Sequence, residues 1–143
     1  MIGPLDEYPI HQAPLPITRV ASSDRNFYDR CYFNAMDTAD DGELMLVTGL
    51  GYYPNLGVKD AYAVLRRGDV QTAVHLSDAI DDNRLDQRVG NYRLEVVEPL
   101  HKLRLVLEET EGIAFDLTWD GSFDVVQEHP HLMLNGVRPT LDA

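Results

Sequence analysis

The sequence predicts an all-β protein, an antiparallel meander that forms a barrel or a strongly curved half-barrel. Runs of alternating apolar and polar residues, each of strand length, recur along the chain. Glycine, proline and aspartate separate these runs at short intervals. Helical periodicity is nearly absent. A sheet of roughly seven such strands must pair with a second sheet or curl on itself to protect its edges, which favours the barrel-like architecture.

Residues 43–60 are predicted to organise the fold. Residues 44–47 form an apolar run of strand length, and Gly49 and Gly51 indicate a bulge or a close approach of two backbones. Residues 52–55 then place two phenol rings, a proline and a carboxamide at a strand end, where β proteins often bind ligands. The same residues are also ordinary turn chemistry covered by two half-buried tyrosines, and the sequence leaves both interpretations open.

Further strands are predicted on both sides of this stretch. Alternation from Phe27 to Asn34 places odd-numbered residues on one face and even-numbered residues on the other. Residues 38–42 have the composition of a hairpin loop, and Arg67-Gly68-Asp69 is the strongest hairpin signal in the chain. Three more strands are expected over residues 92–99, 102–109 and 113–120, and the polar connection 78–88 is long enough for one helical turn.

The chain is expected to comprise an N-terminal arm and one β domain. Residues 1–18 contain four prolines, which predicts an extended arm that lies along its own barrel or along another subunit. Residues 19–143 show no composition shift and form the β domain. The last residues resemble a strand without a polar terminator, so we expect the sequence to stop within a longer protein.

Composition excludes several function classes. The chain has 24 acidic and 12 basic residues, a formal net charge of −12, which disfavours binding to nucleic acid or to an anionic lipid surface. No apolar run approaches the roughly 20 residues needed to span a bilayer, and residues 1–17 lack the features of a secretory signal. The single cysteine, Cys31, agrees with a reducing, cytoplasmic location and is expected to be a small core residue.

Two aspartates are candidates for acid catalysis, because a carboxyl group buried in an apolar cavity can stay protonated and act as a proton donor. Asp116 alternates with apolar residues in the strand that ends at the only tryptophan, and Asp29 lies on the apolar side of its strand. The sequence favours the competing interpretation of Asp116 as a solvent-facing residue on an amphipathic strand. For Asp29 it favours a structural ion pair with Arg30 or Arg25.

Aromatic and amide side chains are the candidate ligand-binding groups, since they can line a cavity and orient the polar end of a ligand. The alternative is that they fill the core or its rim. No metal site or cofactor site is predicted, since residues 128–131 offer histidines without a third ligand and no phosphate-binding glycine loop is present. The candidate ligand-binding residues are Tyr28, Tyr32, Asn34, Tyr52, Tyr53, Asn55 and Trp119.

Three segments, residues 23–37, 48–69 and 115–131, resemble the amino-terminal half of an uncharacterised actinobacterial family. That family is distantly similar to the AttH and carotenoid 1,2-hydratase (hydroxyneurosporene synthase) group. The resemblance implies a lipocalin-like fold, with this chain as one half of a two-barrel protein. It also implies cofactor-free hydration or cyclisation of isoprenoid-like or polycyclic substrates.

Three function hypotheses follow. The first is a hydratase or cyclase that acts on a hydrophobic small molecule. The second is a carrier or sensor that binds such a molecule without chemistry. The third is a structural module, which assembles as a homodimer or with a second barrel.

Overall fold

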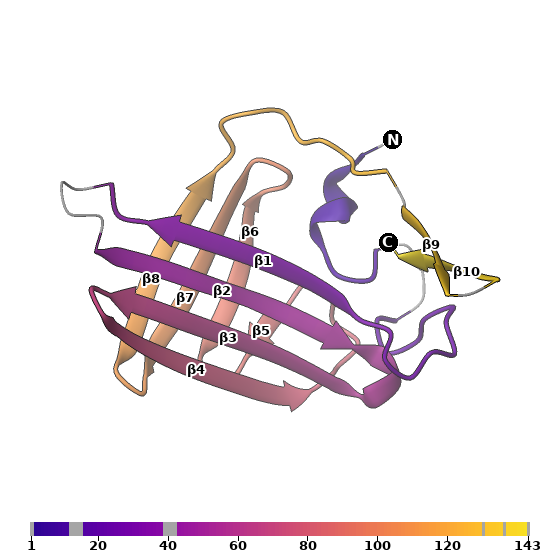
Figure 1. Cartoon of the computed structure of the whole chain (residues 1–143), viewed down its shortest axis with the longest axis horizontal. Coiled ribbons are helices and arrows are strands. Elements are labelled where there is room, and N and C mark those ends of the chain that lie inside the picture. Colours follow the sequence, from indigo (N-terminus) through magenta and orange to yellow (C-terminus); the bar gives the residue numbers. More distant parts are fainter. Residues whose placement is uncertain (1, 12–15, 39–42, 130, 136, 143) are drawn as a thin grey trace.

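Two antiparallel four-stranded sheets form the body of the protein (Figure 1). The computed structural model describes residues 2–11, 16–38, 43–129, 131–135 and 137–142. The first sheet has the order β1-β2-β3-β4, with bounds Asp29–Met36, Leu44–Tyr53, Val58–Arg67 and Val70–Ala79. The second has the order β5-β6-β7-β8, with bounds Gln87–Val89, Tyr92–Glu98, Lys102–Thr110 and Ile113–Asp120. The all-β class and the antiparallel meander are confirmed.

Short elements lie outside the two sheets. Two 3-10 helices span Pro4–Glu7 (η1) and Pro54–Leu56 (η2), and β9 (His131–Asn135) pairs with β10 (Arg138–Asp142). The described residues form no α-helix, so the helical turn considered for residues 78–88 is not found. None of the described helices is long and apolar enough to cross a membrane.

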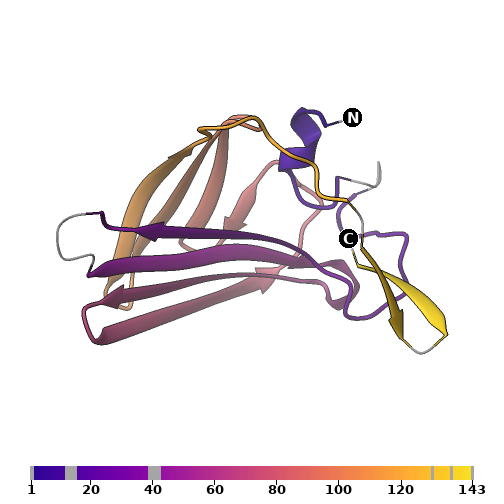
Figure 2. The same ribbon diagram turned by 45° about the horizontal axis from the view of Figure 1, so that its top comes forward.

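The two sheets face each other and meet along one side (Figure 2). On that side β5 contacts β3 and β4. On the other side β1 and β8 are the outer strands of their sheets, and the N-terminal segment and residues 121–129 lie over the opening between them. Within the described residues the sheets therefore do not close into one hydrogen-bonded barrel.

The hairpin between β3 and β4 forms where it was predicted. Arg67 pairs with Val70, so the connection has two residues, and Gly68 has a φ of 58°. Glycine adopts this left-handed conformation without steric cost, which is why the Gly-Asp pair makes a tight turn. Strands β6, β7 and β8 match the three predicted C-terminal strands. The hairpin loop predicted at residues 38–42 lies mainly outside the described residues.

Gly49 allows the close approach of two backbones that was predicted, whereas Gly51 lies against side chains. A Cβ atom on Gly49 would overlap the carbonyl oxygen of Cys31 and would lie 2.9 Å from the Tyr62 ring. A Cβ atom on Gly51 would lie 2.6 Å from an Asp60 carboxylate oxygen. Because these glycines keep the ladder regular, β2 continues through them to Tyr53, and the turn begins only at Pro54.

The core lies between the inner faces of the two sheets. Leu50, Leu105 and Ile113 are at most 1% exposed. The Tyr92 ring packs edge-on against Phe115, and its hydroxyl forms a 3.2 Å hydrogen bond with Thr48 Oγ1 of the opposite sheet. This buried polar contact links the two sheets within a mainly apolar layer.

The N-terminal segment is part of this folded unit, and it differs from the predicted extended arm. Residues Pro4–Glu7 form a 3-10 helix, and Ile10 and Ile17 are each 1% exposed in the core. Proline at the first helical position supplies a suitable φ and lacks an N–H that would need a partner. The segment therefore packs along the open side of its own sheets.

Candidate functional site

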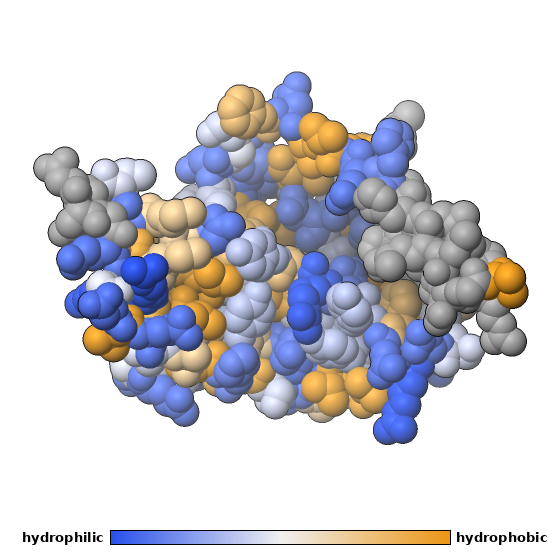
Figure 3. Space-filling model, viewed as in Figure 1, coloured by the Kyte–Doolittle hydropathy of each residue, from blue (hydrophilic) through white to orange (hydrophobic). Residues whose placement is uncertain are grey.

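An apolar cavity of about 460 Å³ opens between β1 and β8, beneath the N-terminal segment and residues 121–129. We call it the apolar cavity. Its inner wall comes from both sheets, with Phe33 of β1 facing Leu103 of β7 and Trp119 of β8. Val125 and Val126, in the segment after β8, also line it. In Figure 3 apolar surface gathers where this segment passes over the top of the molecule.

Strand register explains how the inner wall forms. Leu103 and Trp119 are cross-strand neighbours in the β7-β8 pair, so their side chains share the inner face. Phe33 lies on the inner face of β1, and its ring centroid is 5.4 Å from that of Trp119 in an edge-to-face arrangement. This contact spans the open side of the sheets, where no strand pairing joins them within the described residues.

Charged groups lie at the rim of the apolar cavity, and each carboxylate there has a partner. Asp6 pairs with His11 at 3.1 Å, and Asp120 pairs with Lys102 at 2.7 Å and raises the pKa of that lysine. Glu7 accepts a 2.5 Å hydrogen bond from the backbone N–H of Leu100. Each of these three carboxylates is engaged by a basic side chain or a backbone N–H, so none of them is free to contact a bound alkene as a proton donor.

A second pocket, of about 170 Å³, lies beside the same N-terminal segment, and we call it the polar pocket. The first sheet contributes Asp29, Cys31 and Tyr52, and β5 contributes Gln87. Tyr52 and Gln87 are 2% and 5% exposed, yet the Tyr52 hydroxyl and the Gln87 Nε2 atom have no hydrogen-bond partner among the described residues. A buried polar group without a partner costs about 1–3 kcal/mol, so each of these two groups lowers the stability of the fold.

Asp29 faces inward, as its position in the alternation predicts. It is half buried in the polar pocket, where it accepts a 2.6 Å hydrogen bond from the backbone N–H of Ile10. Arg30, one of its two predicted ion-pair partners, is on the outer face instead, hydrogen-bonded to the Tyr53 hydroxyl and 5.3 Å from the Tyr28 ring centroid. Asp29 therefore anchors the N-terminal segment through the backbone.

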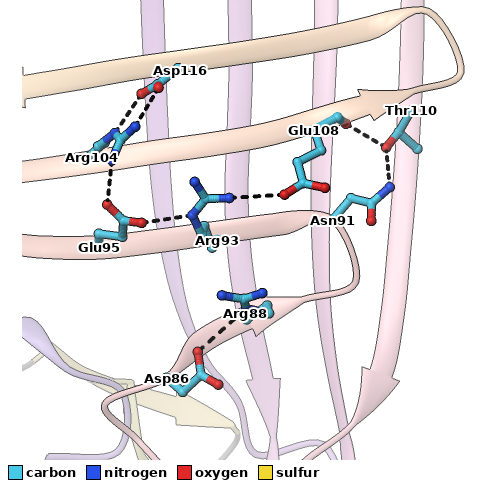
Figure 4. Close-up of polar contacts among 9 residues, drawn as sticks. All are labelled: Asp86, Arg88, Asn91, Arg93, Glu95, Arg104, Glu108, Thr110 and Asp116. Atoms are coloured by element: carbon cyan, nitrogen blue, oxygen red, sulfur yellow. Dashed lines mark hydrogen bonds and ion pairs between the residues drawn. The ribbon is translucent and has the colours of Figure 1, made fainter.

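Asp116 lies on the outer surface of the second sheet, away from both pockets (Figure 4). Arg104 of β7 donates two hydrogen bonds to it, at 2.7 and 2.6 Å, and continues to Glu95 of β6. The guanidinium holds the pKa of Asp116 below its ordinary value. This geometry matches the interpretation of Asp116 as a solvent-facing residue. A proton donor for an alkene would have to lie protonated in an apolar cavity, and Asp116 is an ionised carboxylate on the surface.

The predicted ligand-binding residues are divided between the interior and the outer surface of the protein. Tyr52 lies in the polar pocket and Trp119 in the apolar cavity. Tyr28 and Tyr32 are each 58% exposed on the outside. Asn55 donates to the carbonyl oxygens of residues 22 and 24 and thus acts as a turn residue. The remaining two, Asn34 and Tyr53, lie on the outer side with Tyr32 and Arg30.

Strand alternation alone could have predicted which of these residues face inward and which face outward, because adjacent residues such as Tyr52 and Tyr53 must point to opposite faces. Gln87 and Phe33 were missed as site residues. The sequence carries no signal for Gln87, since its strand has three residues and its neighbours in the polar pocket come from the other sheet and from the N-terminal segment. Burial raises the pKa of the Cys31 thiol to about 12, so Cys31 is protonated at neutral pH.

Comparison with known proteins gives one match. The model of a family of unknown function (DUF8625) matches residues 2–143. No curated protein and no solved structure matches the chain significantly.

Proposed function

Since this chain belongs to the family of unknown function DUF8625, whose model covers nearly its whole length, we propose a function from its own geometry. The protein binds a hydrophobic small molecule, of isoprenoid-like or polycyclic shape, in the apolar cavity. The observation that carries this proposal is a cavity of about 460 Å³ walled by Phe33, Leu103 and Trp119. Pockets of roughly 300–1,000 Å³ with apolar and aromatic walls are typical of small-molecule sites.

The chemistry of the lining supports an apolar ligand with a polar end. Burial of apolar area contributes about 25 cal/mol for each Å² removed from water, and aromatic walls add ring contacts. The charged groups at the rim, Asp6, His11 and Asp120, lie where the polar end of such a ligand would meet solvent. The ligand body therefore lies along Trp119 and Phe33.

We favour binding without catalysis, because every carboxylate that lines the apolar cavity is paired with a basic side chain or hydrogen-bonded to a backbone N–H. Hydration or cyclisation, which the resemblance to the AttH and carotenoid 1,2-hydratase group implies, would depend on Asp29 in the neighbouring pocket. Loss of turnover of an isoprenoid substrate in Asp29→Asn, with Asp116→Asn unaffected, would establish the catalytic version. Full turnover in Asp29→Asn would exclude this residue as the acid.

The architecture is proposed to be a lipocalin-like half-barrel whose open side serves as the ligand entrance. Among the described residues, the outer strands β1 and β8 have edges without a strand partner on either side of the apolar cavity, and such edges favour further pairing. Assembly of two copies, or with a second barrel, would use these edges. Light scattering of the purified protein distinguishes the cases, since a strictly monomeric mass would remove the dimeric alternative.

The single tryptophan makes ligand binding measurable without a label. Trp119 lines the apolar cavity, so the neutral dye N-phenyl-1-naphthylamine bound there should quench tryptophan emission by energy transfer. The proposal predicts a saturable titration. Emission that remains unchanged up to the solubility limit of the dye would contradict it.

We predict that Val126→Glu weakens binding of this dye at least tenfold, which corresponds to about 1.4 kcal/mol. The substitution replaces an apolar lining group by a charge beside the rim carboxylates. Val126 is 85% exposed, so the fold should be unaffected. Val70→Glu is the matched control, because Val70 is 67% exposed and lies outside the cavity. Equal weakening by both variants would show that the effect is not local.

A further inference from the structure

We propose that the polar pocket is a second binding site, which takes a small neutral molecule carrying both a hydrogen-bond acceptor and a hydrogen-bond donor, as in a primary carboxamide. The inference rests on Tyr52, Gln87 and Asp29 and does not depend on what the apolar cavity binds.

The ligand needs an acceptor because the two orphaned groups are donors. Tyr52 and Gln87 come from different sheets and both line the pocket, and the Tyr52 hydroxyl and Gln87 Nε2 lack partners. Burial raises the pKa of the Tyr52 phenol, so its proton is retained and available for donation. Both atoms are closed to solvent, so a ligand carbonyl oxygen would satisfy them once the two side chains turn toward the pocket.

The ligand needs a donor because a carboxylate stands next to these groups. Asp29 is the cross-strand neighbour of Tyr52 in the β1-β2 pair, on the same inner face. One of its oxygens accepts from the Ile10 N–H at 2.6 Å. A carboxylate has about four acceptor positions, so Asp29 has capacity for an N–H or O–H group of the ligand.

The charges around the pocket favour a neutral ligand. Three carboxylates, those of Asp6, Glu7 and Asp29, line it, which disfavours an anion. Of the basic groups that line it, Arg30 is hydrogen-bonded to Tyr53 on the outer face and His11 is paired with Asp6. Lys59, the cross-strand neighbour of Tyr52, is paired with Asp81 at 2.7 Å. An anionic ligand would therefore find only basic groups that already have partners.

The size of the pocket sets the choice of probe. At about 170 Å³ it has room for a molecule with a single ring, since an engineered cavity of about 150 Å³ holds benzene. Leu50 and Pro9 supply apolar wall beside the polar groups. Benzamide carries a ring, a carbonyl and an NH₂ group. Acetophenone lacks the donor, and benzoate replaces it by a negative charge.

The test is a nuclear magnetic resonance titration that follows the side-chain amide of Gln87, assigned by its absence from Gln87→Met. Benzamide should shift this signal saturably, acetophenone should bind at least tenfold more weakly, and benzoate should cause no shift. The absence of a saturable benzamide shift would overturn the proposal, and so would equal binding of all three probes. If the pocket takes up only water, benzamide will cause no saturable shift, and the proposal is overturned.

Two phenylalanine substitutions separate a ligand-binding hydroxyl from a structural one. Tyr52→Phe removes an orphaned hydroxyl, so it should raise Tm by about 3 °C without probe and abolish the benzamide shift. Tyr92→Phe is the matched control, because it removes a hydroxyl bonded to Thr48, and it should lower Tm while benzamide still binds. A Tm loss in Tyr52→Phe as large as in Tyr92→Phe would contradict the proposal. Dye binding in the apolar cavity should persist in both variants, which keeps the two sites distinguishable.

Discussion

Gly49→Ala is expected to lower the free energy of unfolding by about 3 kcal/mol, the upper end of the usual cost of overpacking. The added methyl group would overlap the backbone carbonyl oxygen of Cys31 and crowd the Tyr62 ring. Strand pairing fixes the carbonyl, because Cys31 lies in the regular β1-β2 ladder. Urea unfolding followed by circular dichroism measures the change.

Substitutions of two other glycines provide comparisons for the stability loss in Gly49→Ala. Gly51→Ala should cost about 1 kcal/mol, because the closest atoms there belong to the Asp60 and Tyr53 side chains, which can rotate away. Gly3→Ala should change stability by less than about 0.5 kcal/mol, since nothing lies within 4 Å of the added atom. A larger cost at Gly51 than at Gly49 would contradict the close backbone approach.

Asp81→Asn is expected to cost about 2 kcal/mol at pH 7. Lys59 projects into the interior with a side chain that is 6% exposed, and Asp81 is its ion-pair partner at 2.7 Å. Removing one member of a buried pair leaves an uncompensated charge, which costs about 3–5 kcal/mol. Asp81 is 51% exposed, so water reduces the penalty here. Thermal unfolding of the wild type and the variant gives the difference.

The same pair predicts a pH dependence. The hydrogen bond from Lys59 lowers the pKa of Asp81 from its ordinary value of 3.8. A carboxyl group whose pKa is lower in the folded state stabilises the fold fully above its unfolded-state pKa and loses that contribution as pH falls. The stability difference between wild type and Asp81→Asn should therefore shrink below about pH 4.

The double variant Lys59→Met, Asp81→Asn is the control for this pair. Replacing both charged groups removes the buried charge while keeping most of its apolar volume, so stability should return to near the wild-type value. If the double variant were as unstable as Asp81→Asn, the destabilisation would come from the loss of Asp81 itself and not from an unpaired, buried charge on Lys59.

Local patterns in the sequence were sufficient for the strands and for the direction of their side chains. Alternation placed Asp29 and Cys31 inside and Tyr28 and Tyr32 outside, because successive residues of a strand must face opposite sides. Gly68 was identifiable because a two-residue turn requires its φ of 58°. These features depend on residues close together in the chain.

The candidate sites could not be predicted in the same way, because they depend on contacts between sheets. Phe33 meets Trp119 only when the β1 and β8 edges come together, and no local pattern encodes that contact. The role of Asp116 also depended on a contact that its own strand does not reveal. Its place on its strand was clear, but its role was set by Arg104, which the register of β7 against β8 places diagonally beside it.

The most direct test of the proposed apolar cavity is a nuclear magnetic resonance titration of the intact protein with N-phenyl-1-naphthylamine. It would follow the Trp119 indole N–H and the methyl groups of Leu103 and Val126. Binding in the apolar cavity should cause saturable shifts at these three residues with one common dissociation constant, and no shift at Val70. Shifts confined to the outer face around Tyr28 and Tyr32, or no saturable shift at all, would contradict it.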